Sequence, residues 1–138
     1  MGNSNRENKL KDFSTTIIPR FYETDALGHI NNASIAAWFE VARVRFLESL
    51  GESDPSAARD WMLVSVQIDF VAETFYGTDV TASITEATIG NTSLALACEM
   101  SQGGRLTVKA RATLVHMDVQ DKKPARISDA MREVLASR

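Results

Sequence analysis

The sequence predicts an α+β fold, in which a curved antiparallel sheet of about five strands wraps around one long central helix and a second helix follows at the C-terminal end. Two observations predict this arrangement. Apolar residues recur at helical spacing between positions 34 and 50, whereas between positions 64 and 114 they alternate with polar residues in four runs. Such a sheet has one apolar face, and the long helix is the only predicted element large enough to cover it.

The chain begins with a polar segment, which a first strand follows. Residues 1–11 are polar, and we expect them to form a flexible tail ahead of a single domain at residues 12–138. The segment Phe13–Phe21 is rich in Thr and Ile and is predicted to be a strand. Pro19 has no backbone N–H to donate, which indicates that the strand ends at a sheet edge or a bulge.

The long helix is predicted at Ser34–Leu50. Its apolar residues at helical spacing are Ile35, Trp38, Phe39, Ala42, Phe46 and Leu50. We expect Asn32 or Ser34 to cap its start and Gly51 to take the left-handed position after its end. Because small and apolar residues also occupy its other faces, we expect the helix to be extensively buried.

Four strands and a short helix complete the predicted fold. The alternating runs lie at 64–70, 80–85, 94–99 and 106–114. Turn signals separate them at Tyr76-Gly77-Thr78, Gly90-Asn91 and Gln102-Gly103-Gly104. Consecutive strands with short connections predict an antiparallel meander. The last helix is predicted from Ser128, its cap, to Ala136, with Met131, Val134 and Leu135 facing inward.

Composition excludes several classes of protein. The net charge of −3 and the pI of about 5.4 leave no broad basic field, so we expect neither a nucleic-acid nor a membrane partner. No apolar run reaches the length of a membrane span, and the first residues lack the apolar core of a signal peptide. The single cysteine, Cys98, falls in an alternating apolar run and is predicted to be a small buried hydrophobe. A cytoplasmic location fits these features.

The segment Arg20–Arg43 carries the most specific pattern in the chain. It reads as a short strand, then D-x-x-G-H-x-N-N, then a helix with an F-E-x-A-R stretch. Its matching residues are Asp25, Gly28, His29, Asn31, Asn32, Phe39, Glu40, Ala42 and Arg43. This pattern resembles the signature of 4-hydroxybenzoyl-CoA thioesterase-like hotdog proteins, and the resemblance covers roughly residues 13–120. The segment 75–80, FYGTDV, resembles that family's Y-G-D region, although Glu73 stands where a proline is common.

The resemblance implies a fold, an assembly and an activity. The fold is the hotdog, in which a curved sheet wraps one central helix. The assembly is a homodimer whose two sheets join edge to edge, with active sites at the subunit interface, and in many members a homotetramer. The activity is hydrolysis of thioesters of coenzyme A or, in some branches, of acyl carrier protein. We therefore expect an acyl-CoA thioesterase that needs no cofactor.

Thioester hydrolysis requires a group that activates water or attacks the carbonyl, and a donor that stabilises the developing oxyanion. Asp25 is a carboxylate just ahead of a predicted helix, whose first N–H groups are unpaired and lie at the positive end of its dipole. By resemblance, the donor is the backbone N–H of Asn32, and Asp25 acts as general base or as nucleophile. His29 is expected either to orient the loop as a structural histidine or to position Asp25 or the thioester, while Gly28, Asn31 and Tyr76 are assigned to substrate binding.

Several alternatives remain open at the level of sequence. Asp25 has a simpler interpretation as a loop or capping aspartate. Glu40 and Arg43, three apart on the helix, are suited to a structural ion pair, and Glu40 is also a second candidate for the catalytic carboxylate. Non-catalytic binding of acyl thioesters and hydrolysis of acyl carrier protein thioesters are alternative functions. A hydratase is a third, but its own pairing of His and carboxylate is not found.

The sequence indicates no metal site, because His29 and His116 are far apart and Cys98 has no partner in a C-x-x-C motif. The phosphates of coenzyme A would need surface cations. The candidates are Arg105, Lys109, Arg111, Lys122, Lys123 and Arg126.

Overall fold

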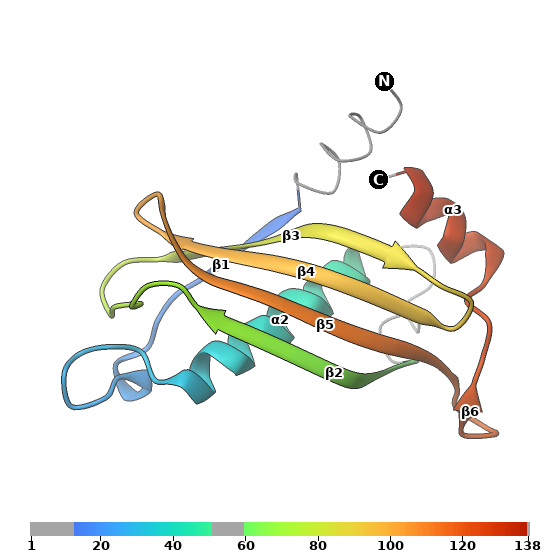
Figure 1. The fold of residues 1–138 in the computed structure, drawn as a ribbon, viewed down its shortest axis with the longest axis horizontal. Helices are drawn as coiled ribbons and strands as arrows, with labels where there is room; N and C mark the ends of the chain where they lie inside the picture. Colours follow the sequence, from blue (N-terminus) through green and yellow to red (C-terminus); the bar gives the residue numbers. More distant parts are fainter. Residues whose placement is uncertain (1–12, 51–59, 138) are drawn as a thin grey trace.

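The computed structural model of the chain describes residues 13–50 and 60–137 (Figure 1). Its elements are β1 (Ser14–Ile17), the 3-10 turn η1 (Phe21–Glu23), α2 (Asn32–Leu50), β2 (Trp61–Phe70), β3 (Val80–Ile89), β4 (Ser93–Gln102), β5 (Arg105–Asp118), β6 (Lys123–Pro124) and α3 (Asp129–Ser137). The α+β class, the order of the elements and the central helix are confirmed. Within these ranges no helix is long and apolar enough to cross a membrane. The predicted N-terminal tail lies outside the described residues.

The strand order in the sheet corrects one prediction. The order is β1-β3-β4-β5-β2, with every pairing antiparallel, and β6 pairs with β5 outside this path. Only β3, β4 and β5 form a meander, because β2 pairs with β5 at the far edge instead of with β3. The connection at residues 71–79 therefore passes the ends of β5 and β4 to reach β3. The alternation of apolar and polar residues in β2 is the same whether β2 pairs with β3 or with β5, so it does not predict the partner.

The side chain of Gln102 at the end of β4 holds the connection at residues 71–79 in place. Its Oε1 accepts the N–H of Phe75 at 3.0 Å, and its Nε2 donates to the carbonyls of Phe75 at 2.6 Å and Thr78 at 2.8 Å. At the start of the connection, the N–H groups of Val71 and Ala72 both donate to the carbonyl of Thr107. These bonds fix the position of the residues that follow β2.

The core lies between α2 and the inner face of the sheet, behind which α2 runs in Figure 1. All six helix residues predicted to be apolar at helical spacing are buried. From the sheet they meet the inward set Val80, Ala82, Ile84, Leu94, Leu96, Cys98, Met100, Val108, Ala110, Ala112 and Leu114. The expectation that α2 is buried around most of its circumference is wrong for this chain alone. Ala36, Ala37, Val41 and Val44 are exposed, because the sheet covers one face of the helix only.

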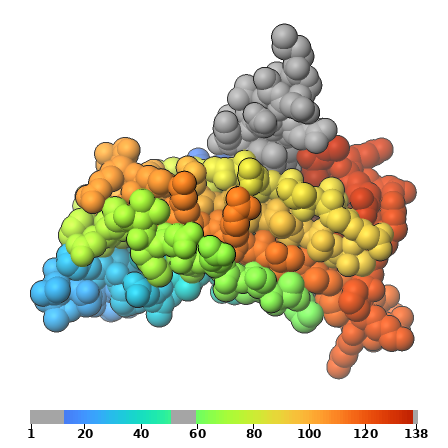
Figure 2. Space-filling model, viewed as in Figure 1, coloured from blue at the N-terminus to red at the C-terminus, as the bar shows by residue number. Residues whose placement is uncertain are grey.

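The edge strand β2 is poorly covered. Figure 2 looks onto the face of the sheet that is turned away from α2, and β2 runs along the border of that sheet beside β5. Five of its apolar side chains are between 41% and 51% exposed: Met62, Leu63, Val64, Val66 and Phe70. Isolated exposed apolar residues are ordinary, but a run of them along an unpaired strand edge forms a surface suited to pairing with another chain.

Two element boundaries differ from the prediction. The first strand ends at Ile17, because Pro19 has no N–H to continue the ladder with β3. The helix α2 begins at Asn32, and its cap is Asn31, not Asn32 or Ser34. Asn31 Oδ1 accepts the N–H of Ser34 at 2.7 Å, the bond by which an Asn side chain caps a helix. The predicted role of Gly51 at the other end lies outside the described residues.

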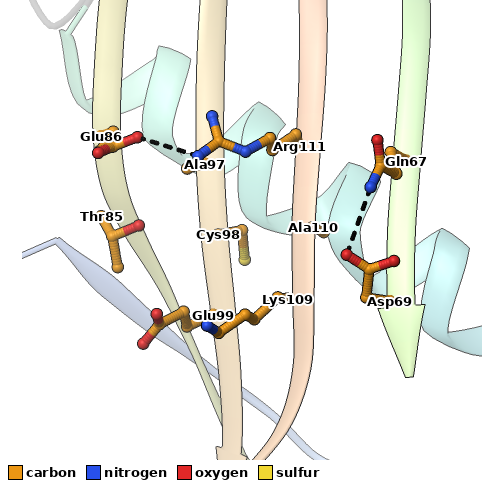
Figure 3. Close-up of a pocket in the computed structure, with 10 residues that line it drawn as sticks. All are labelled: Gln67, Asp69, Thr85, Glu86, Ala97, Cys98, Glu99, Lys109, Ala110 and Arg111. Atoms are coloured by element: carbon orange, nitrogen blue, oxygen red, sulfur yellow. Dashed lines mark hydrogen bonds and ion pairs between the residues drawn. The ribbon is translucent and has the colours of Figure 1, made fainter. Parts of the chain in front are cut away.

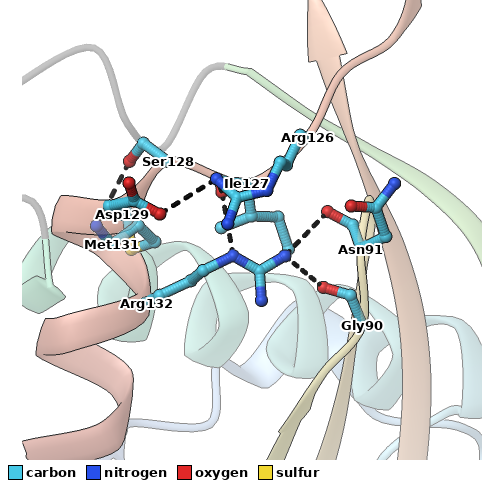
Figure 4. A network of polar contacts seen from close by, with 8 residues as sticks. All are labelled: Gly90, Asn91, Arg126, Ile127, Ser128, Asp129, Met131 and Arg132. Atoms are coloured by element: carbon cyan, nitrogen blue, oxygen red, sulfur yellow. Dashed lines mark hydrogen bonds and ion pairs between the residues drawn. The ribbon is translucent and has the colours of Figure 1, made fainter.

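The C-terminal helix α3 forms where it was predicted, with Ser128 as its cap. Leu135 is buried, and Met131 and Val134 pack against the core. The guanidinium of Arg132 donates to the carbonyls of Gly90, Asn91 and Ile127, which ties α3 to the turn between β3 and β4 (Figure 4). These contacts hold α3 against the core and the β3–β4 turn.

Candidate active site

A pocket of about 360 Å³ lies where the start of α2 meets the end of β2. Its lining residues are Asp25, His29, Ile30, Asn32, Ile35, Phe70, Val71, Ala72, Glu73 and Thr74. Half of them are apolar and half carry polar groups, so the pocket offers both kinds of surface to a ligand. The pocket joins two segments of the chain, the loop ahead of α2 and the connection that follows β2.

The loop ahead of α2 is organised around the carboxylate of Asp25. Its Oδ1 accepts the N–H groups of Leu27 at 2.7 Å and His29 at 3.1 Å, and the N–H of Asp25 donates to the carbonyl of His29 at 2.7 Å. Gly28 takes φ +82° between them, a conformation that side chains with a Cβ rarely adopt. One carboxylate oxygen therefore shapes the turn. The other, Oδ2, lies 3.9 Å from His29 Nδ1, and the Asp25 side chain is 44% exposed.

His29 lies between two carboxylates. Its Nε2 is 2.8 Å from Glu73 Oε2, and its Nδ1 is 3.9 Å from Asp25 Oδ2. Its ring packs at a steep angle against the ring of Phe75, with the ring centroids 5.1 Å apart. The backbone joins the same segments, since His29 and Phe75 form a bridge and the N–H of Ile30 donates to the carbonyl of Thr74. The ring is thus held on both sides.

The start of α2 supplies backbone donors to the same pocket. The N–H of Ser34 is taken by the side chain of Asn31, and the N–H of Ile35 donates to the carbonyl of Asn31. The first two amides of the helix, those of Asn32 and Ala33, have no acceptor within the helix. Because Asn32 lines the pocket, a carbonyl oxygen bound there would meet an unpaired N–H at the positive end of the helix dipole.

The structure brings together some of the residues selected from the sequence and separates others. Asp25, His29 and Asn32 line one pocket, whereas Gly28, Asn31 and Tyr76 do not line it. Gly28 forms the turn, and Asn31 caps α2 and donates from Nδ2 to the carbonyl of Glu23 at 2.8 Å. Tyr76 is half-exposed and packs edge-on against Phe21. Substrate binding by these three residues stays a prediction.

Two polar residues of the pocket, Glu73 and Thr74, were missed by the sequence analysis. Glu73 entered it only as a departure from the family pattern, and Thr74 did not enter it at all. Thr74 is buried in the pocket wall, and its hydroxyl has no hydrogen-bond partner among the described residues. The available signal was the unusual carboxylate at position 73, but nothing local to it indicates that it meets His29.

The helix pair Glu40 and Arg43 does not form the expected ion pair, since no contact within 4.0 Å joins them in the described ranges. Arg43 is buried, with its guanidinium 4.5 Å from the centroid of the Phe39 ring. Burial lowers the pKa of Arg43, and the charge of Glu40 opposes this shift. Glu40 does not line the pocket, so its use as the catalytic carboxylate has no geometric support.

A second hollow, of about 190 Å³, lies on the outer face of the sheet (Figure 3). It carries charged side chains of both signs, and the guanidinium of Arg111 lies 3.6 Å from the carboxylate of Glu86. Lys109 and Arg111, two of the cations considered for coenzyme A phosphates, lie here and not at the pocket beside α2. Cys98 is buried behind this face, as predicted, and desolvation raises the pKa of its thiol to about 12. A neutral thiol of this kind is a poor nucleophile.

The described residues contain no group of three or more His, Cys, Asp or Glu side chains that could hold a metal ion.

Comparison with known proteins gives a consistent family. The model of the thioesterase-like superfamily matches residues 19–135. A predicted thioesterase from Bacillus stearothermophilus is 36% identical, with a TM-score of 0.81 over 89% of this chain and 92% of that one. No curated protein sequence matches the chain.

More distant structures share the fold. A thioesterase from Thermus thermophilus, crystallised with coenzyme A and zinc, is 24% identical, with a TM-score of 0.79 over 88% of this chain and 95% of that one. A 1,4-dihydroxy-2-naphthoyl-CoA thioesterase from Synechocystis is 17% identical, with a TM-score of 0.74 over 89% of this chain and 94% of that one. The hotdog fold expected from the sequence is confirmed.

Proposed function

Because this chain belongs to the thioesterase-like superfamily, we propose that it hydrolyses acyl-CoA thioesters, with Asp25 as the catalytic carboxylate. One observation carries the proposal. Asp25, whose Oδ1 alone accepts the hydrogen bonds that shape the loop, and Asn32, whose amide opens α2, line the same pocket. A thioester carbonyl in that pocket would have an oxyanion donor on one side and a carboxylate on the other.

The proposed reaction is a general-base hydrolysis. Asp25 Oδ2 removes a proton from water, and the water oxygen attacks the thioester carbon while the carbonyl π electrons move onto the oxygen. The N–H of Asn32 stabilises this oxyanion, a type of interaction typically worth about 3 kcal/mol in the transition state. The oxyanion then collapses, the C–S bond breaks, and the departing thiolate takes the proton from Asp25. The products are a carboxylic acid and free coenzyme A.

The shape of the pocket supports an acyl substrate. Its apolar lining includes Ile30, Ile35 and Phe70, which suits the hydrocarbon part of an acyl or aroyl group. The pocket has no Lys or Arg among its described lining residues. We therefore place the coenzyme A phosphates outside it, where cations of this chain or of a second chain would meet them.

The test is a thiol-release assay on a panel of acyl- and aroyl-CoA thioesters with Asp25→Asn. The amide oxygen of Asn still accepts the N–H groups of Leu27 and His29, so the loop stays folded while the base is lost. We expect kcat to fall by about 10²- to 10⁴-fold, the usual contribution of a general base. Glu86→Gln, which removes an exposed carboxylate on the outer face, should leave kcat unchanged. Wild-type protein that binds acyl-CoA and never releases thiol would establish the non-catalytic alternative.

Asp25 also has the option of attacking the carbonyl itself and forming an anhydride. Turnover in ¹⁸O-labelled water followed by mass spectrometry of the protein tests for an anhydride that water opens at its aspartyl carbonyl. The proposed general-base route leaves the protein unlabelled. Hydrolysis of an anhydride at its aspartyl carbonyl would place ¹⁸O in the Asp25 peptide and refute the role of a base.

We further propose that the chain acts as a homodimer that pairs through β2. The exposed apolar edge of β2 supports this assembly, and so does the position of Phe70–Thr74, which leads from that edge into the pocket. A second chain at β2 would also border the catalytic site. Light scattering of Val66→Lys should detect monomers, whereas Val119→Lys, which changes an exposed valine outside β2, should keep the wild-type mass. A monomeric wild-type protein, or a dimeric Val66→Lys variant, would contradict this interface.

A further inference from the structure

We propose that Glu73 is a positioning residue that holds His29 in the tautomer whose Nδ1 accepts a hydrogen bond beside Asp25. The inference rests on the proposed hydrolysis and adds a residue to it. It follows from the order of three side chains across the pocket, in which the imidazole of His29 lies between Glu73 and Asp25.

The distances on the two sides of the ring are unequal, and this inequality selects the tautomer. A neutral imidazole has one N–H donor and one acceptor nitrogen. Glu73 Oε2 is 2.8 Å from Nε2, within hydrogen-bond range, whereas Asp25 Oδ2 is 3.9 Å from Nδ1, outside it. We assign the N–H to the nitrogen that faces the nearer carboxylate, because that carboxylate is the better placed acceptor. The proton therefore resides on Nε2, and Nδ1 presents its lone pair toward Asp25.

The backbone supports this assignment, because Glu73 belongs to a segment that is attached to His29. Thr74 accepts the N–H of Ile30, and Phe75 bridges to His29 and packs against its ring. The Gln102 side chain fixes Phe75 from the other side. Glu73 thus reaches Nε2 from a constrained backbone, although its own side chain is 62% exposed.

This tautomer has a consequence for the attacking water. Two groups 3.9 Å apart can both bind one water molecule, since each hydrogen bond spans about 2.8 Å. If Nδ1 and Asp25 Oδ2 are both acceptors, the water donates both of its hydrogens to them. Its oxygen lone pairs then point away from the two groups and remain free for the thioester carbon. In the opposite tautomer, Nδ1–H would occupy a lone pair of that water and weaken it as a nucleophile.

The two carboxylates therefore compete for the imidazole proton, and removal of Glu73 should transfer it. In Glu73→Ala, Asp25 is the remaining carboxylate beside the ring, which favours the Nδ1–H form. In Glu73→Gln, the amide oxygen still accepts Nε2–H, so the wild-type tautomer is retained without the charge. These two variants separate the hydrogen bond from the negative charge.

The experiment is ¹⁵N NMR of histidine-labelled protein, which reports the tautomer from the shifts of the two ring nitrogens. The chain has two histidines, so His29→Ala assigns the spectrum. Spectra are recorded at about pH 8, above the usual range of imidazole titration. We expect the Nε2–H form for His29 in the wild type and in Glu73→Gln, and a shift toward the Nδ1–H form in Glu73→Ala.

Kinetics supply the second measurement. We expect kcat to fall by about tenfold in Glu73→Ala with KM nearly unchanged, the lower end of the losses seen when a carboxylate that orients a metal-binding histidine is removed. Glu73→Gln should recover most of kcat, and Glu86→Ala controls for loss of an exposed glutamate. An unchanged tautomer in Glu73→Ala, or wild-type kcat in that variant, would overturn the inference. Since the NMR arm needs no turnover, it also tests Glu73 in a protein that proves not to hydrolyse thioesters.

Discussion

Replacement of Asn31 by Ala tests how the start of α2, and with it the oxyanion donor, is held. Asn31 makes two side-chain hydrogen bonds in a partly buried position, to the N–H of Ser34 and to the carbonyl of Glu23. Loss of a helix cap costs typically about 1 kcal/mol of unfolding free energy. Loss of the bond to Glu23 costs about 1 kcal/mol more. We expect Asn31→Ala to be destabilised by about 2 kcal/mol.

This free energy converts to a measurable shift in melting temperature. An unfolding entropy of about 2.1 cal/mol/K per residue gives about 0.29 kcal/mol/K for 138 residues, so the Tm should fall by about 7 °C. Circular dichroism melts at fixed protein concentration measure it, since the proposed dimer would make Tm depend on concentration. We also expect slower thiol release, because a frayed first turn no longer holds the amides of Asn32 and Ala33 in place.

Two further variants sharpen the test. Asn31→Ser keeps a capping oxygen and removes the donor to Glu23, so its Tm should fall by about half as much as that of Asn31→Ala. Asn32→Ala is the matched control for stability, because the Asn32 side chain is exposed and has no hydrogen bond within the described residues. The reasoning fails if Asn31→Ala melts within about 2 °C of the wild type. It also fails if Asn31→Ser is destabilised as much as Asn31→Ala.

Two other predictions concern the connection after β2 and the buried thiol. Gln102→Ala removes three hydrogen bonds to the segment that carries Glu73, so we expect a lower kcat and an unfolding free energy reduced by about 1–3 kcal/mol. Gln67→Ala removes one long hydrogen bond, to Asp69, and should change neither kcat nor the unfolding free energy. Equal effects of the two variants on denaturant melts and thiol release would contradict this role. Burial raises the pKa of Cys98 from 9.0 to about 12. The folded state therefore holds this proton more tightly than the unfolded state, and stability should decline as the pH rises above about 9. Cys98→Ala should remove that part of the decline, and rapid reaction of native Cys98 with a thiol reagent at neutral pH would show that the thiol is not buried.

The local pattern of the sequence was sufficient for most of the elements. The change of apolar period after α2 identified the helix and the long strands, because burial on one face requires one period in a helix and another in a strand. Asp25, His29 and Asn32 were identifiable together because they lie within eight consecutive residues, in the loop ahead of α2 and at the first position of that helix. Their mutual placement depends on bonds within a few residues, such as those from Asp25 to Leu27 and His29.

The partner of an edge strand is not a local property. β2 has the same alternation whether it pairs with β3 or with β5, and the pairing with β5 depends on how the connection at residues 71–79 crosses the sheet. The exposed side of α2 and the uncovered edge of β2 were missed for the same reason. Apolar composition indicates that a surface is to be covered, but not whether the same chain covers it.

The sequence by itself determined the α+β class, the long helix and the loop that presents Asp25, because hydrophobic periodicity and short-range hydrogen bonding act between near neighbours. Only the tertiary structure decided that residues 73–75 meet His29, that Thr74 lines the same pocket and that β2 is an open edge. These contacts join segments more than forty positions apart. They depend on the packing of the whole sheet around α2, which no short stretch of sequence encodes.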